Sequence, residues 1–188
     1  MNFILASASE RRQELLKRIV DEFTVMVSNF DEGLIKNTGS VSEYVQDIAL
    51  GKAKDIMNGV RNDSIIIAAD TVVSLEGKIL GKPKDKEEAY NMLSSLSNNV
   101  HKVYTGVVVI NTKTKVVLKD YVETKVFFSK LTSEEINAYI ETGDPFDKAG
   151  AYGIQGKAGV FIEKIEGCYY NVVGLPLNKL NEMIKEVY

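Results

Sequence analysis

Near its amino end the chain reads Ile4-Leu-Ala-Ser-Ala-Ser-Glu-Arg-Arg-Gln-Glu-Leu-Leu16, a pattern typical of a strand that runs into a helix. Helix N–H groups, a serine hydroxyl and guanidinium groups can together bind a phosphate. Because this segment follows a strand, it would lie at the carboxyl edge of a sheet, where open α/β folds bind ligands. The alternative is a Ser-capped helix with two solvated arginines, and the spacing alone favours neither interpretation.

Outward from this segment, helices and strands first alternate, and long paired strands follow. Strands are predicted over Phe3–Ala6, Phe23–Val27 and Ser64–Ala69, with a polar loop over Ser28–Gly39. Helices are predicted after Ser40, Asp85 and Thr132, each three residues before a glutamate, and after Pro176. Hairpins are predicted over Val100–Ser129, turning at Asn111–Lys115, and over Ala158–Val173, turning at Glu166–Gly167. This order predicts a single α/β domain over residues 1–188 with a mixed, largely antiparallel sheet.

The composition excludes several classes of protein. The chain has 188 residues, 45% of them hydrophobic, and a net charge of −3 without a basic stripe, which argues against nucleic-acid binding. The single cysteine, Cys168, rules out an internal disulfide. No apolar run reaches the ~18 residues of a membrane span, and no signal peptide is evident, so a cytoplasmic protein is expected. The sequence leaves open whether the chain forms a homodimer.

Two further segments carry motifs. Ser64-Ile-Ile-Ile-Ala-Ala-Asp70-Thr71 is an apolar run that ends in a carboxylate, and Gly81-Lys82-Pro83 follows soon after. Asp144-Pro-Phe-Asp-Lys-Ala-Gly-Ala-Tyr-Gly-Ile-Gln-Gly156 is rich in glycine. Together with the first segment, these motifs resemble the Maf family of nucleoside triphosphate pyrophosphatases, in order and over nearly the whole chain. One departure is Glu10, which stands where the family usually has proline and adds a negative charge beside the expected phosphate site.

The resemblance implies both a fold and an activity. The fold would be an elongated sheet with helical lobes around a central cleft, as in inosine triphosphate pyrophosphatases. The activity would be hydrolysis of a nucleoside triphosphate to the monophosphate and pyrophosphate, which removes nucleotides from the pool. Two alternatives stay open: a regulatory or adaptor protein that inhibits septum formation during cell division, and a module that binds phosphate anions without turnover.

Two carboxylates are the candidates for catalysis. Asp70 would be held rigidly at the end of a buried strand, and the family resemblance assigns it as the base that activates water. Glu32 matches an acid that completes the cluster, and two carboxylates with several waters are a usual way to hold Mg²⁺ or Mn²⁺. No His/Cys cluster exists, so zinc is not expected, and the lone His101 is interpreted as structural or solvent-facing.

The remaining candidates concern substrate binding. The expected phosphate ligands are Ser7, Arg11, Lys52 and Lys82. The residues that would mark the family branch acting on dTTP and UTP are Arg12, Thr71 and Gln155. A glutamine amide both donates and accepts, so Gln155 could pair with thymine or uracil and, turned over, with cytosine, which leaves CTP open as a substrate. For Asp147 and Lys148 the sequence does not decide between a loop ion pair and contact with substrate.

Overall fold

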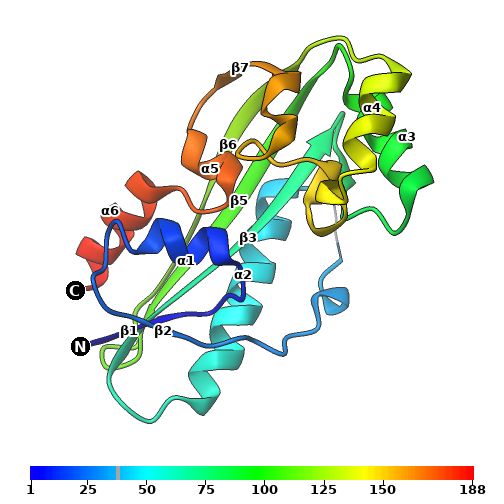
Figure 1. Cartoon of the computed structure of the whole chain (residues 1–188). Coiled ribbons are helices and arrows are strands. Elements are labelled where there is room, and N and C mark those ends of the chain that lie inside the picture. Colours follow the sequence, from blue (N-terminus) through cyan, green and yellow to red (C-terminus); the bar gives the residue numbers. More distant parts are fainter. Residues whose placement is uncertain (37–38) are drawn as a thin grey trace. The chain divides into compact units, whose positions relative to one another are not determined.

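The structure is a computed structural model that describes residues 1–36 and 39–188 (Figure 1). The chain divides into two compact units. Unit 1 comprises Met1–Asp70, Thr105–Val122 and Gly174–Tyr188, and unit 2 comprises Thr71–Tyr104 and Glu123–Val173. The expectation of a single domain over residues 1–188 stays a prediction, as does the central cleft.

The described residues form a seven-stranded mixed sheet (Figure 1). Its order is β2 (Thr24–Val25), β1 (Asn2–Leu5), β3 (Ser64–Leu75), β5 (Val100–Asn111), β6 (Val117–Phe128) and β7 (Ile162–Glu166), with β4 (Lys78–Leu80) paired to β3. β1 runs parallel to both β2 and β3, whereas β4 and β7 pair antiparallel with β3 and β6. The mixed α/β class expected from the sequence is confirmed.

In unit 1 the first part of β3 is covered by helix α2 (Val41–Gly59). The Ser40 side chain caps α2 by accepting from the Glu43 amide, as the spacing predicted. Alanines at positions 49, 53 and 68 share one buried cluster with Ile66 and Ile110. Small side chains at this contact let α2 approach the sheet closely, which matters for the polar groups that follow along the same face.

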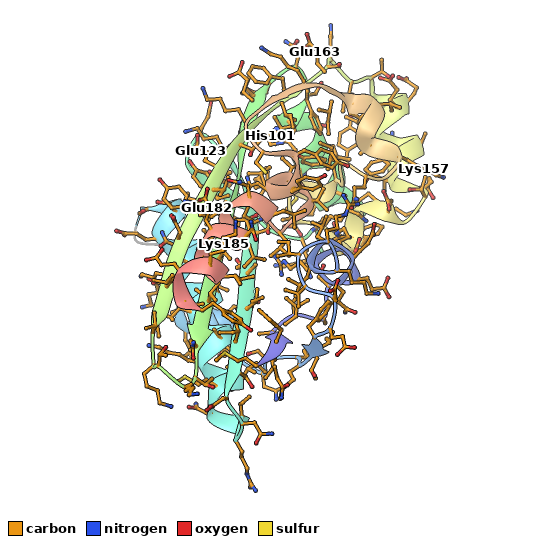
Figure 2. The ribbon with its side chains drawn as sticks, turned by 90° about the vertical axis from the view of Figure 1, so that its left-hand side faces the viewer. His101, Glu123, Lys157, Glu163, Glu182 and Lys185 are labelled. Carbon is orange, nitrogen blue, oxygen red and sulfur yellow. The ribbon has the colours of Figure 1, made fainter. Side chains whose placement is uncertain are left out.

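The other helices of unit 1 are α1 (Glu10–Leu16) and α6 (Leu177–Val187). α1 ends at Leu16, and Ile19 lies in a turn beyond it. α6 begins after Pro176 as predicted, and it is strongly amphipathic. Glu182 and Lys185 lie on its exposed face (Figure 2), opposite the buried Leu180, Met183, Ile184 and Val187.

Unit 2 is built on helices α3 (Lys86–Leu96), α4 (Ser133–Ile140) and α5 (Tyr169–Val173). Asp85 caps α3, and Thr132 with Glu135 forms a complete capping box on α4, so both predicted helix starts are confirmed. The long strands β5 and β6 and the turn between them also match the expectation. The core of this unit is rich in aromatic residues, including Phe128, Tyr139, Tyr152 and Phe161.

The predictions for β3, for β2 and for the second hairpin were wrong. β3 does not end at Ala69 but continues through Asp70 to Leu75, because the β-branched residues Thr71, Val72 and Val73 extend it. β2 covers two residues instead of Phe23–Val27, because only Thr24 and Val25 find partners on the short β1. Of the predicted polar loop, residues 37 and 38 lie outside the described residues, and Glu32–Leu34 forms a 3-10 helix.

The predicted hairpin over Ala158–Val173 was the third error. Residues Lys157–Phe161 form a 3-10 helix, β7 is confined to Ile162–Glu166, and Tyr169–Val173 is helical. The buried Asn171 side chain donates to the Val103 carbonyl at 3.0 Å and to Thr124 Oγ1 at 2.9 Å. These long-range bonds favour the helical turn over the strand that the local residues predicted.

Candidate active site

Glu32, Lys52 and Asp70 meet at one point in unit 1. Lys52 Nζ lies 2.8 Å from Asp70 Oδ1 and 2.7 Å from Glu32 Oε1. The side chains of Lys52 and Asp70 are 16% and 12% exposed, whereas that of Glu32 is 54% exposed. The structure therefore brings together the two acids that the sequence paired, and it places an expected phosphate ligand between them.

The packing of α2 on β3 explains this meeting. Ala68 and Asp70 are two residues apart on β3, so both point to the same face of the sheet. Ala68 packs with Ala53 of α2, and Lys52 precedes Ala53 in that helix. Once the alanines set the helix on the sheet, the Lys52 side chain reaches the next polar position along β3, which is Asp70.

Tyr44 belongs to the surroundings of this cluster and was missed in the sequence. Burial raises the pKa of the Tyr44 hydroxyl, and the negative charges of Asp70 and Glu32 raise it further, while Lys52 opposes them. Tyr44 precedes Lys52 by two helical turns on α2, so both lie near the same face of the helix. That spacing was the available signal, but it could not be interpreted before the helix face was known.

Hydrogen bonds of the Arg12 side chain connect the start of α1 to the segment before α6. Its Nε donates to the Gly174 carbonyl at 2.8 Å, and its Nη1 donates to Ser7 Oγ at 3.3 Å. Ser7 is buried, and its Oγ also accepts from the Ser9 amide at 3.2 Å. Burial lowers the pKa of the Arg12 guanidinium, the nearby Asp70 and Glu32 raise it, and Arg11 lowers it. Ser9 caps the helix, as in the alternative considered above, but Arg12 is half-buried, not solvated.

Unit 2 carries the other expected substrate ligands. Thr71 is half-buried and follows Asp70 in β3, while Lys82 and Gln155 are exposed. The loop of Lys82 contacts the Gly-rich segment, because the Gly81 carbonyl accepts from the Gly150 amide at 3.0 Å. The structure thus joins two of the sequence motifs within unit 2.

Lys148 forms a loop ion pair. Its Nζ lies 2.6 Å from Asp147 Oδ1 and 3.1 Å from Asp144 Oδ1, and it donates to the Asp144 carbonyl at 2.6 Å. The Lys148 side chain is only 12% exposed. The ion pair that the sequence left as one of two alternatives is therefore present.

His101 is structural, and the solvent-facing alternative was wrong. The residue is 1% exposed, and its Nε2 lies 2.7 Å from the Tyr152 hydroxyl, inside the aromatic core of unit 2 (Figure 2). Its ring meets those of Phe128 and Tyr152 edge-on. Burial lowers the pKa of His101 to about 4, so the imidazole is neutral at pH 7.

The acidic side chains suit a cation that keeps other ligands. Within residues 1–36 and 39–188 no group of three or more His, Cys, Asp or Glu side chains is arranged to enclose a metal ion. Glu32 and Asp70 converge on one point with carboxylate oxygens, which is the donor set that Mg²⁺ and Mn²⁺ accept beside water and phosphate oxygens. In the same described part of the chain, no helix combines the length and apolar character of a membrane span.

Comparison with known proteins agrees with the motifs. A family model described as Maf-like protein matches residues 2–187. The chain belongs to the Maf-like family. A relative from Clostridium botulinum, named dTTP/UTP pyrophosphatase, is 62% identical over 186 residues, which cover 99% of each chain. A relative of the same name from Clostridium beijerinckii is 58% identical over 187 residues, which cover 100% of each chain.

The Maf-like chain also shares its fold with solved structures of low sequence identity. The Ham1 protein of Staphylococcus aureus superposes with a TM-score of 0.50 at 15% identity, covering 100% of both chains. A HAM1 protein from Coxiella burnetii gives a TM-score of 0.50 at 13% identity, covering 99% of both. These likenesses concern the fold alone.

Proposed function

We propose that this Maf-like protein hydrolyses dTTP and UTP to the nucleoside monophosphate and pyrophosphate, and so removes these nucleotides from the pool. The observation that carries the proposal is the full-length identity, up to 62%, to relatives named dTTP/UTP pyrophosphatase. At such identity over whole chains, the local geometry of the site is expected to be shared. The cluster of Glu32, Lys52 and Asp70 supplies groups that this chemistry needs.

Asp70 is the proposed base. Its carboxylate would accept the proton of a water molecule that attacks the α-phosphorus, with pyrophosphate as the leaving group. Lys52, whose Nζ lies 2.8 Å from Asp70 Oδ1, would fix the orientation of this carboxylate. The strand β3 and its buried neighbours hold the carboxylate in place, so little reorganisation is needed when substrate binds.

Glu32 and Asp70 are the residues that would hold a divalent cation, Mg²⁺ or Mn²⁺. When bound, such an ion would neutralise phosphate charge and make water a better nucleophile. The role of the protein would be to hold the two carboxylates near each other, and Lys52 pairs with both of them in this structure.

The binding residues keep the roles that the resemblance implies. Ser7 and Arg11 in unit 1 and Lys82 in unit 2 are proposed phosphate ligands, and Lys52 would contact phosphate from its place between the carboxylates. Arg12, Thr71 and Gln155 are proposed to select pyrimidine bases. The exposed amide of Gln155 has both a donor and an acceptor, as uracil and thymine require.

A substrate panel tests the proposal. Pyrophosphate release would be measured for dTTP, UTP, CTP, GTP and 7-methyl-GTP with Mg²⁺ or Mn²⁺, using wild type and Gln155→Ala. We expect the highest kcat/KM for dTTP and UTP, and a loss of ~1–3 kcal/mol of discrimination in the variant, because its base contact is removed.

The other possible results of this panel each contradict a different part of the proposal. Unchanged selectivity in Gln155→Ala would remove that residue from base recognition. Folded protein without turnover of any nucleotide would contradict the enzyme and favour the adaptor. Thermal stabilisation by nucleotide without pyrophosphate release would favour the anion-binding module.

A further inference from the structure

The loop at residues 28–34 is attached to α2 by hydrogen bonds to the carboxylate of Asp55. Asp55 Oδ2 accepts from Ser28 Oγ at 2.8 Å and from the Asn29 amide at 2.8 Å. Ser28 Oγ in turn accepts from the Phe30 amide at 3.0 Å. One side chain of α2 therefore fixes three consecutive residues of the loop.

A second attachment lies on the same face of α2. The ring of Phe30 covers Gly51 so closely that a Cβ at this position would come within 3.0 Å of three ring carbons. Gly51 and Asp55 are four residues apart, so they lie one above the other on the helix. Glycine is a poor helix former, and its presence inside this helix is explained by the ring that fills the place of a side chain.

The loop fastened in this way carries Glu32. The Glu32 side chain is 54% exposed, and its carboxylate pairs with Lys52 Nζ at 2.7 Å. An exposed ion pair by itself holds a side chain weakly. The backbone beneath Glu32 must therefore be held by other contacts if the carboxylate is to stay beside Asp70.

We propose that Asp55, Gly51 and Phe30 are positioning residues that keep Glu32 in place for the reaction. This inference rests on the proposed function, since it assigns these residues a part in the same site. They touch neither the carboxylate of Glu32 nor that of Asp70 in the contacts above, and they act through the loop backbone. Lys52, next to Gly51 in the sequence, then meets a carboxylate whose position is already set.

Hydrogen exchange tests whether the contacts with α2 hold the loop at residues 28–34, and this measurement does not depend on activity. Gly51→Ala would improve local helix propensity but displace the Phe30 ring, so the amides of residues 28–34 should exchange at least tenfold faster than in wild type. Gly59→Ala is the matched control, because it lies in the same helix and a Cβ there meets nothing within 4 Å. Equal exchange in both variants would overturn the proposal, even if the protein hydrolyses no nucleotide.

Kinetics test whether the attachment of the loop to α2 affects the reaction through the position of Glu32. We expect kcat/KM for dTTP to fall at least tenfold in Gly51→Ala and less than twofold in Gly59→Ala. In a Glu32→Gln background, adding Gly51→Ala should change the remaining rate less than twofold, because no carboxylate is left to position. An equal loss in both backgrounds would show that Gly51 acts elsewhere and would overturn the inference.

Asp55 provides a second test if Gly51→Ala does not fold. Asp55→Ala removes the acceptor for Ser28 and Asn29, and should speed exchange in residues 28–34 and lower kcat/KM. Asp55→Asn keeps an oxygen that can accept these bonds, and should restore most of the activity. Equal activity of the two variants would contradict the positioning role, and absence of turnover in wild type would instead contradict the proposed function.

Discussion

At the scale of single residues, the environment of Asp70 is what separates a structural acid from a reactive one. Aspartate is disfavoured inside strands, yet Asp70 lies in the middle of β3 with 8% of its surface exposed. Lys52 offsets the cost of burying this charge, because its ammonium lies 2.8 Å away. A buried, paired carboxylate on a rigid strand is costly to maintain without a function, which agrees with the proposed role as base.

Asp70→Asn tests that role. The amide keeps the shape of the side chain but cannot accept the proton of water, so we expect the hydrolysis rate to fall roughly 10²–10⁴-fold while the fold is retained. The rate would be measured by pyrophosphate release, and the fold by circular dichroism. Asp47→Asn is a suitable control, because Asp47 forms an exposed pair with Lys119 in the same unit. A rate above a tenth of wild type in Asp70→Asn would remove it from catalysis.

At the scale of elements, the approach of α2 to the sheet depends on a glycine in β5. A Cβ at Gly106 would lie under 3.0 Å from backbone atoms of Val45 and Gln46 in α2. Backbone cannot move aside as the end of a flexible side chain can. The close contact of helix and strand therefore sets the distance between α2 and the sheet. This distance in turn determines how far the side chains of Tyr44 and Lys52 extend from α2 over the sheet.

Gly106→Ala should accordingly destabilise unit 1. Overpacking of a closed interface typically costs ~1–3 kcal/mol, and this clash involves backbone, so the upper part of that range is expected. The measurement is the free energy of unfolding in urea, and Gly59→Ala provides the reference for a glycine with open space. A variant as stable as wild type would show that α2 can shift on the sheet at little cost.

At the scale of the whole molecule, the family match extends over residues 2–187 and so includes both compact units. Each unit has a hydrophobic core of its own: an aliphatic one around Ile4, Ile66 and Ile110 in unit 1, and an aromatic one around Phe128 and Tyr152 in unit 2. His101 belongs to the second core, and its lowered pKa links the stability of the chain to pH.

This link predicts a loss of stability in mild acid. The unfolded chain binds a proton on His101 below about pH 6.5, whereas the folded chain does so only below about pH 4, so stability falls as pH drops through this window. By pH 5 the loss from this group is about 2 kcal/mol. Urea unfolding at pH 7 and pH 5 should therefore show a smaller pH dependence for His101→Gln than for wild type. The same dependence in both proteins would contradict the assignment to His101.

Much of the chain could be predicted from local sequence. Ser40, Asp85 and Thr132 each cap a helix three residues before a glutamate, and all three helices begin where expected. The long strands β5 and β6 likewise follow from their β-branched and aromatic residues. These signals are reliable because caps, turns and periodic patterns arise between residues within about four positions of each other.

The tertiary structure alone decided where the polar groups meet. Lys52 and Asp70 are 18 residues apart, and His101 and Tyr152 are 51 apart, so their contacts depend on how α2 and the strands pack. The same holds for Asn171, whose long-range bonds replace a predicted strand with a helical turn, and for Phe30, which covers Gly51. The sequence by itself determined the family, the starts of helices α2, α3, α4 and α6, and the acids of the candidate site. The partners of those acids were decided by the packing of helix on sheet, because a side chain's neighbours across a core depend on the rotation and register of whole elements, which no local pattern contains.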